Sequence, residues 1–300
     1  MSNRSLSLLG LLTAGALATA SLAGCADNSK DEGSGGGSAG ASVEKDADLA
    51  ALVPDDIAKA GKLTVGTEAG YAPNEFLDSS NKIVGFDIDL FDAVAKKLGL
   101  TATYQDSTFD NIIPGVQGGS YQVGVSSFTD NTEREQVVDL TTYFEAGTQW
   151  AQAKGGDVDP DAACGKKVAV QTGTVQLEDI TARSTKCTDA GKSAIDVLQF
   201  DDQGQATNAV VLGQAEAMLA DSPVTAYAVR QSNDALELDG DVYEAAPYGY
   251  VTAKDGKLAK ALQAAVQSLI DDGSYADILK KWGLDDGAIK TSEINAAGGK

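Results

Sequence analysis

The chain has 300 residues, 43% of them apolar, so it is long enough for two ordinary domains or one large two-lobed domain. Its 44 Asp and Glu outnumber its 23 Lys and Arg, and the net charge of −21 excludes the basic surface that nucleic-acid binding needs. It contains no histidine, the usual general base and the commonest transition-metal ligand. We therefore expect a globular protein with no nucleic-acid partner, no metal site and no cofactor.

Residues 1–24 predict a lipoprotein signal peptide. A positive start with Arg4 precedes an apolar run from Leu6 to Ala20, which is too short and weak for a secure membrane span. Leu-Ala-Gly-Cys follows at 22–25 and resembles the lipobox of bacterial lipoproteins, in which the cysteine is acylated. We therefore expect an extracytoplasmic protein, lipid-anchored to the cell membrane through Cys25. A plain secretory signal with an incidental cysteine is the alternative.

Residues 25–54, rich in Asp, Ser and Gly, predict a flexible tether without fixed structure. Residues 62–66 predict a first strand. The stretch 85–99 then predicts an amphipathic helix that ends at its final glycine. The apolar stripe of this helix consists of Ile88, Phe91, Val94, Ala95 and Leu98.

The start of this helix, Gly-Phe-Asp-Ile-Asp-Leu at 85–90, resembles the signature of the family-3 solute-binding proteins, which serve polar amino-acid ABC importers. The resemblance covers roughly residues 56–290, with further motifs in the expected order. It implies an α/β, two-lobed periplasmic-binding-protein fold of type II-like topology, with a ligand cleft between lobes joined by two crossing strands. The implied segments are a first lobe at 55–147 and 248–290, a second lobe at 148–247 and a loose tail at 291–300.

Three first-lobe residues match positions that contact the aliphatic stem or the side chain of the ligand in this family. The resemblance implies that Tyr71 packs on the aliphatic stem of the ligand and that Phe109 closes its other side. Glu68 stands where some members place an acid that binds the ligand side chain. The alternatives are a half-buried loop tyrosine, a core phenylalanine and a solvated glutamate.

Residues 126–134 resemble the carboxylate clamp of the family. Arg134 offers two donors in a planar fork to an α-carboxylate, and Ser126, Ser127 and Thr129 add hydroxyl and backbone donors. The interval from Thr129 to Arg134 is two residues longer than in the shorter members. A surface arginine is the alternative for Arg134.

The resemblance implies that a loop at the start of a helix in the second lobe holds the same carboxylate through its backbone amides. The residues concerned are Thr172, Gly173, Thr174, Val175 and Gln176. Asp221 ends an apolar strand, where α/β folds place ligands, and is implied to accept the α-ammonium. A helix N-cap is its alternative role, and the two roles are compatible.

In an exported protein, the two cysteines that remain after Cys25, Cys164 and Cys187, predict a disulfide. Two thiols without histidine make a metal site a poor alternative.

Taken together, these features predict a substrate-binding lipoprotein that works as a monomer and is not an enzyme. It would capture a polar amino acid, cationic if Glu68 lines the pocket, and present it to an ABC permease and ATPase complex. A dehydratase-like cleft enzyme of the same fold and a ligand-sensing module are the alternatives.

Overall fold

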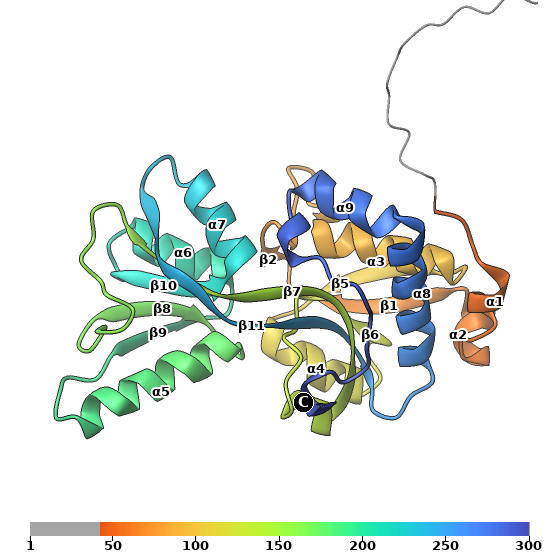
Figure 1. Ribbon diagram of the computed structural model, residues 1–300, viewed down its shortest axis with the longest axis horizontal. Coiled ribbons are helices and arrows are strands. Elements are labelled where there is room, and N and C mark those ends of the chain that lie inside the picture. The colour runs from red at the N-terminus through yellow and green to blue at the C-terminus, as the bar shows by residue number, and fades with distance from the viewer. Residues whose placement is uncertain (1–42, 300) are drawn as a thin grey trace, which may run out of the picture. The chain divides into compact units, whose positions relative to one another are not determined.

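The computed structural model describes residues 43–299 (Figure 1). The predicted signal peptide and the predicted acylation site Cys25 lie outside the described residues. In chain order the elements are α1 (Ala47–Ala50), α2 (Asp55–Ala60), β1 (Lys62–Thr67), β2 (Gly70–Tyr71), β3 (Glu75–Leu77), β4 (Ile83–Val84), α3 (Phe86–Lys97), β5 (Thr101–Asp106), α4 (Phe109–Gln117), β6 (Val123–Gly124), the 3-10 turn η1 (Arg134–Gln136), β7 (Val138–Ala153), β8 (Lys167–Gln171), α5 (Val175–Asp189), β9 (Asp196–Phe200), α6 (Gln203–Val211), β10 (Ala217–Asp221), α7 (Ser222–Gln231), β11 (Leu236–Ala253), α8 (Leu258–Asp272), α9 (Ser274–Trp282) and the 3-10 turns η2 (Asp285–Gly287) and η3 (Ala297–Gly299).

The main sheet of the described chain has the strand order β5-β1-β6-β11-β7-β10-β8-β9. β1 runs parallel to β5 and β6, and β8 runs parallel to β9 and β10. We call β5, β1 and β6 with α1–α4, α8 and α9 the first lobe, and β8–β10 with α5–α7 the second lobe. The long antiparallel strands β7 and β11 pass from one lobe to the other (Figure 1). The expected α/β class with two crossing strands is therefore confirmed.

All five residues of the predicted stripe on α3 and its C-cap are buried, and all of them except Ile88 join the core of the first lobe. At its N-terminus Gly85 has a φ of 144°, and a Cβ there would collide with the carbonyl oxygen of Asn74. The amide of Phe86 donates to the carbonyl of Pro73 at 3.0 Å. Only glycine permits this approach, so the start of α3 holds the loop that carries Tyr71.

The expected tether over 25–54 is wrong for its described part, because residues 43–54 pack against the first lobe. Asp46 caps α1 with its carboxylate, and its amide donates to the carbonyl of Lys97 at 2.9 Å. Val53 is only 6% exposed and joins the core of the first lobe. Burial of such apolar side chains offsets the entropy of ordering this segment.

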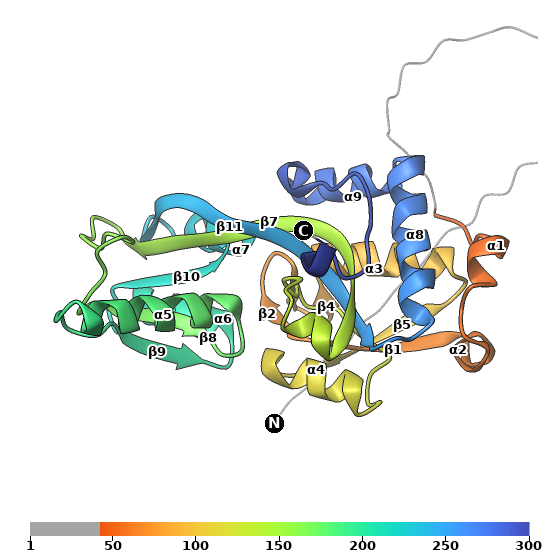
Figure 2. The same cartoon turned by 60° about the horizontal axis from the view of Figure 1, so that its bottom comes forward.

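The expected loose tail from residue 291 is also wrong as far as the structure describes it. Ile294 forms a β-bridge with Thr141 of β7, and the hydroxyl of the buried Ser292 donates to the carbonyl of Thr142 at 2.7 Å. Figure 2 shows the C-terminal end beside β7 and β11. Composition suggested a polar tail, but the segment gains hydrogen bonds from a strand that lies far away in the sequence.

The second lobe contains the predicted disulfide between Cys164 and Cys187, which joins the end of α5 to the loop before β8. On the chain-entropy model, a closed loop of this size stabilises the fold by about 3 kcal/mol. No helix in residues 43–299 is long and apolar enough to cross a bilayer.

Candidate functional site

A narrow pocket lies where the two lobes meet, and it gathers most of the residues selected from the sequence. Its lining consists of Tyr71, Phe109, Ser126, Ser127, Thr129, Arg134, Gln171, Thr174, Val175, Gln176 and Asp221. Of the predicted site residues, Glu68, Thr172 and Gly173 do not line it. Gln171 was missed, although its place at the carboxyl end of β8, directly before the predicted loop, was an available signal.

Arg134 enters the pocket from the first lobe and is 9% exposed, so it is not the surface arginine of the alternative. Its guanidinium carbon lies 5.6 Å and 5.5 Å from the ring centres of Phe109 and Phe128. Its Nη1 donates to the carbonyl of Thr129 at 2.8 Å, and its Nη2 donates to that of Gly173 at 3.2 Å. None of the ion pairs in the described chain involves Arg134. This buried, unneutralised cation therefore suits an incoming carboxylate.

Asp221 faces the same pocket from the second lobe and is 5% exposed. Its Oδ2 accepts a hydrogen bond from the hydroxyl of Tyr71 at 2.9 Å, and its Oδ1 accepts one from Nε2 of Gln176 at 2.8 Å. Asp221 occupies the N-cap position of α7, but its side chain makes no capping hydrogen bond there.

The carboxylate of Asp221 is thus directed into the pocket rather than onto the helix. Burial raises its pKa, and among the described residues no Lys or Arg forms an ion pair with it. Such a group favours a cationic partner, because pairing recovers the cost of burying the negative charge.

Ser126 and Ser127 line the pocket, but their hydroxyl groups are directed toward two acids behind it. The hydroxyl of Ser126 donates to Oε1 of Glu75 at 3.1 Å, and that of Ser127 donates to Oδ2 of Asp87 at 3.1 Å. The hydroxyl of Tyr143 donates to the same Asp87 oxygen at 2.6 Å. These two hydroxyl groups donate to the acids behind the pocket wall and not into the pocket. This differs from the expected role, in which they donate to the ligand carboxylate.

Glu75 and Asp87 are both fully buried and form no ion pair within the described chain. Burial raises the pKa of Glu75 well above its usual value and that of Asp87 to about 6. Because Asp87 accepts the hydrogen bonds from Ser127 and Tyr143, we assign the negative charge to Asp87 and a proton to Glu75. This pair is absent from the predicted site residues, since neither spacing nor composition reveals that two acids share one buried site.

The start of α5 forms the second-lobe side of the pocket. Thr174 is the N-cap of α5: its hydroxyl oxygen accepts from the amide of Leu177 at 3.2 Å, and its hydroxyl donates to the carbonyl of Gln171 at 2.8 Å. The amide of Thr172 donates to the carbonyl of Phe200 at 2.8 Å. The available anion-binding amides therefore belong to the first turn of α5 rather than to Thr172.

Glu68 lies one side chain behind the pocket, with Oε2 accepting a hydrogen bond from Nε2 of Gln171 at 3.1 Å. Burial, followed by the nearby carboxylates of Asp202 and Asp106, raises the pKa of Glu68 to about 8 against the lowering effect of Gln171. Gln171 therefore separates Glu68 from the pocket.

Direct contacts join the lobes across the pocket. Tyr71 reaches Asp221, Arg134 reaches Gly173, and Gln171 reaches Glu68. The free volume between these groups is about 10 Å³, which is about enough for one water molecule. A larger ligand therefore has to separate the lobes and take the place of these contacts.

Residues 63–285 match the family model of the bacterial extracellular solute-binding proteins, family 3. The chain belongs to this family. The predicted family is thus confirmed, and so is the predicted fold, because the chain matches this family model and has the expected two crossing strands.

Several relatives of this family-3 protein carry the names of amino-acid-binding proteins. The arginine-binding protein ArgT of Corynebacterium glutamicum is 39% identical over 287 residues, which cover 94% of each chain. The ABC transporter glutamine-binding protein GlnH of Bacillus subtilis is 30% identical over 70% of this chain and 76% of its own. A solved ancestral arginine-binding protein bound to arginine is 34% identical, with a TM-score of 0.69 over 74% of this chain and 98% of its own. These relatives are named as binding proteins and not as enzymes.

Proposed function

We propose that this family-3 protein is the substrate-binding component of an ABC importer and captures a polar amino acid between its lobes. One observation carries the proposal: Arg134 and Asp221, buried and of opposite charge, line one pocket from different lobes without an ionic partner in the described chain. A zwitterion is costly to desolvate unless both of its charges are paired. Arg134 receives the α-carboxylate together with amides of α5, and Asp221 receives the α-ammonium.

The same contacts make the ligand a bridge between the lobes. Its ammonium replaces the hydroxyl of Tyr71 on Asp221, and its carboxylate engages Arg134 and the first turn of α5. Tyr71 and Phe109 then border the aliphatic stem. A ligand favours the closed form only through contacts that the open form lacks, and these paired charges supply them.

A cationic side chain, such as that of arginine, fits best because Glu68 and its acidic neighbours Asp202 and Asp106 lie behind Gln171. The closed form is presented to a membrane permease with its ATPase. The chain acts as a monomer and has no enzymatic turnover. Cys25 carries the lipid anchor. The lobe boundaries at 147/148 and 247/248 belong to the same proposal.

The experiment that tests this function is a calorimetric titration of residues 26–300 with a panel of amino acids. The protein is purified with its disulfide intact and freed of bound ligand by unfolding and refolding. Micromolar or tighter binding of one polar amino acid supports the proposal. If no amino acid of the panel binds, the proposal is contradicted. Turnover of cyclic acids and binding of a sensory ligand are then the hypotheses to test.

The raised pKa of Glu68 predicts that the selectivity between neutral and cationic amino acids depends on pH. In the described part of the chain, where no cation pairs with Glu68, burial raises its pKa to about 8, and we take the same shift for a form closed over a neutral amino acid such as glutamine relative to a form in which Glu68 is hydrated. The raised pKa stabilises the closed form at low pH, and this contribution is lost as the pH rises through about 8. Glutamine affinity should therefore fall by up to about tenfold per unit between pH 6 and 8, while arginine, which pairs with ionised Glu68, should show little change.

Calorimetry at pH 6, 7 and 8, with Glu68→Gln as the matched variant, measures this effect. We expect Glu68→Gln to remove the pH dependence for glutamine and to weaken arginine binding. Equal pH profiles for the two amino acids in the wild-type protein would place Glu68 outside the binding equilibrium.

Removal of residues 291–300 should affect both stability and binding. Asp130 and Glu135 flank Arg134 and accept hydrogen bonds from the amides of Ala296 and Ala297 at 2.7 Å and 2.8 Å. Their loss exposes these acids and loosens the turn that carries Arg134. We expect Tm to fall by several degrees, at about 2–4 °C per kcal/mol, and amino-acid affinity to fall about tenfold.

Differential scanning calorimetry and ligand titration measure the two effects. A control that lacks only residues 299–300 keeps the acceptor contacts of Asp130 and Glu135. Unchanged affinity after the longer deletion would show that the tail does not support Arg134.

A further inference from the structure

The two crossing strands depart from regular pairing in the middle of β11. The register of β11 against β7 shifts between Asp239 and Tyr243 and again between Tyr243 and Ala246. A Cβ on Gly147 of β7 would lie 2.6 Å from the carbonyl oxygen of Tyr243, so only glycine fits there. Register shifts disrupt the ladder and let a strand bend. Tyr243 therefore lies where the strands that connect the lobes are least constrained by their own hydrogen bonds.

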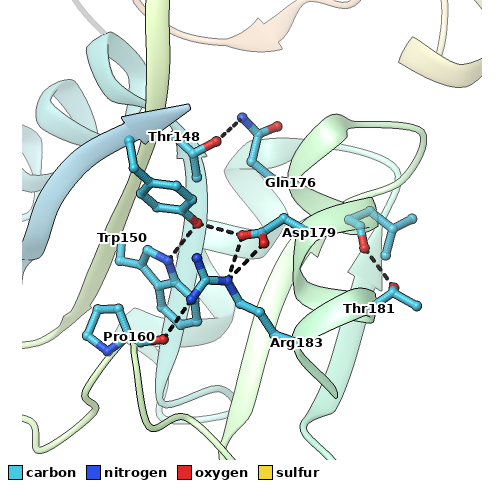
Figure 3. Close-up of polar contacts among 9 residues, drawn as sticks. Thr148, Trp150, Pro160, Gln176, Asp179, Thr181 and Arg183 are labelled. Carbon is cyan, nitrogen blue, oxygen red and sulfur yellow. Dashed lines mark hydrogen bonds and ion pairs between the residues drawn. The ribbon is translucent and has the colours of Figure 1, made fainter. Parts of the chain in front are cut away.

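The side chain of Tyr243 ties this point to helix α5. Its hydroxyl donates to Oδ2 of Asp179 at 2.7 Å and accepts from Nε1 of Trp150 on β7 at 3.0 Å. Nε of Arg183 donates to the same carboxylate at 2.9 Å, and its guanidinium carbon lies 5.0 Å from the centre of the Tyr243 ring. Figure 3 shows Asp179 and Arg183 of α5 facing Trp150. These contacts hold α5 against both crossing strands.

One turn earlier, the same helix carries a residue of the ligand pocket. Gln176 precedes Asp179 by three positions and therefore shares its face of α5. Its Nε2 donates to the hydroxyl oxygen of Thr148 at 3.1 Å (Figure 3) and to Oδ1 of Asp221 at 2.8 Å. Thr148 on β7 is the register partner of both Tyr243 and Asp221. A closed ring of contacts thus joins β11, α5 and β7 beside Asp221.

We propose that Tyr243 is a positioning residue for the ligand site: its hydroxyl holds α5 so that Gln176 stays on Asp221 while the lobes move about the crossing strands. This inference rests on the proposed function, in which Asp221 receives the ligand ammonium. Without the hydroxyl, Asp179 keeps its contact with Arg183, but α5 loses its hydrogen bond to β11. The first turn of α5 is then held to the crossing strands less firmly, and the ligand leaves faster.

The test uses Tyr243→Phe in the protein from residue 26, because this change keeps the ring under Arg183 and removes only the hydroxyl. Stopped-flow fluorescence measures association and dissociation of L-arginine, or of L-glutamine if the panel titration selects it. We expect Kd to rise about tenfold, mainly through faster dissociation. We also expect faster hydrogen exchange of the amides of 175–178 without ligand. Tyr104→Phe is the matched control, since its hydroxyl donates to Asp92 at 2.9 Å in the first lobe, and neither quantity should change there.

A double variant with Gln176→Ala separates positioning from general stability. If Tyr243 acts through Gln176, its effect on Kd is much smaller in the Gln176→Ala background, whereas a purely structural tyrosine gives the same factor in both. Equal factors, or unchanged exchange in α5, overturn the proposal. If Tyr243→Phe fails to fold, Asp179→Ala breaks the same contact from the helix side and is judged by the same measurements.

The two readouts also separate this inference from the proposed function. A wild-type protein that binds no amino acid overturns the proposed function and, with it, the ligand-positioning role of Tyr243. The exchange measurement needs no ligand and still decides whether Tyr243 holds α5. Normal wild-type binding with an unchanged Kd in Tyr243→Phe overturns the Tyr243 role alone.

Discussion

Replacement of Asp221 by Ala is expected to weaken amino-acid binding by roughly 2–5 kcal/mol, which corresponds to between about 30-fold and several thousand-fold in Kd. The ligand ammonium would then be buried without a counter-charge, and Tyr71 and Gln176 would lose their shared acceptor. Asp221→Asn keeps an acceptor oxygen but removes the charge, so it should show most of the loss with less effect on folding. Calorimetric titration gives Kd, and a thermal melt reports folding.

An N-acetylated amino acid sharpens this test, because it lacks the ammonium charge. Wild-type protein should bind it far more weakly than the free amino acid, and Asp221→Asn should discriminate much less between the two. Asp46→Ala, which removes an N-cap aspartate distant from the pocket, is the matched control and should leave Kd unchanged. Near-wild-type binding by both Asp221 variants would remove this residue from the site.

Arg134→Lys is expected to weaken binding about 10- to 100-fold although the positive charge is retained. Lysine provides a point charge in place of the planar fork, and it cannot stack in the same way on Phe109 and Phe128. Arg134→Gln removes the charge as well and should lose more. Titration of both variants with the free amino acid gives the two values of Kd.

The methyl ester of the ligand shows whether the loss concerns the carboxylate. Wild-type protein should strongly prefer the free acid, while Arg134→Gln should bind acid and ester with similar, weak affinity. Arg230→Lys is the matched control, because its guanidinium lies over the ring of Tyr227 outside the pocket lining. A persistent preference of Arg134→Gln for the free acid would assign the carboxylate to other donors.

Local patterns predicted the elements whose contacts lie close in sequence. The stripe of α3 is an example, since helical spacing alone determines which of its side chains share a face. The motif at 126–134 also predicted Arg134 as a binding residue, and the position of an acid at the end of β10 predicted Asp221. Side-chain direction was harder: the hydroxyl groups of Ser126 and Ser127 turn to Glu75 and Asp87, which lie about 40 to 50 residues away in the chain.

The sequence by itself determined the family, the α/β class, the disulfide pairing and the identity of the two charged groups that face the pocket. These follow from residue types and from the resemblance of short motifs to those of a known family, and such motifs are local in the sequence. Only the tertiary structure decided that 43–54 and the C-terminal segment pack, that Glu75 and Asp87 share one buried site, and that Tyr243 contacts α5. These features depend on segments distant in sequence meeting in space. There burial changes the charge that an acid carries, and hydrogen-bond partners come from strands that no local pattern connects.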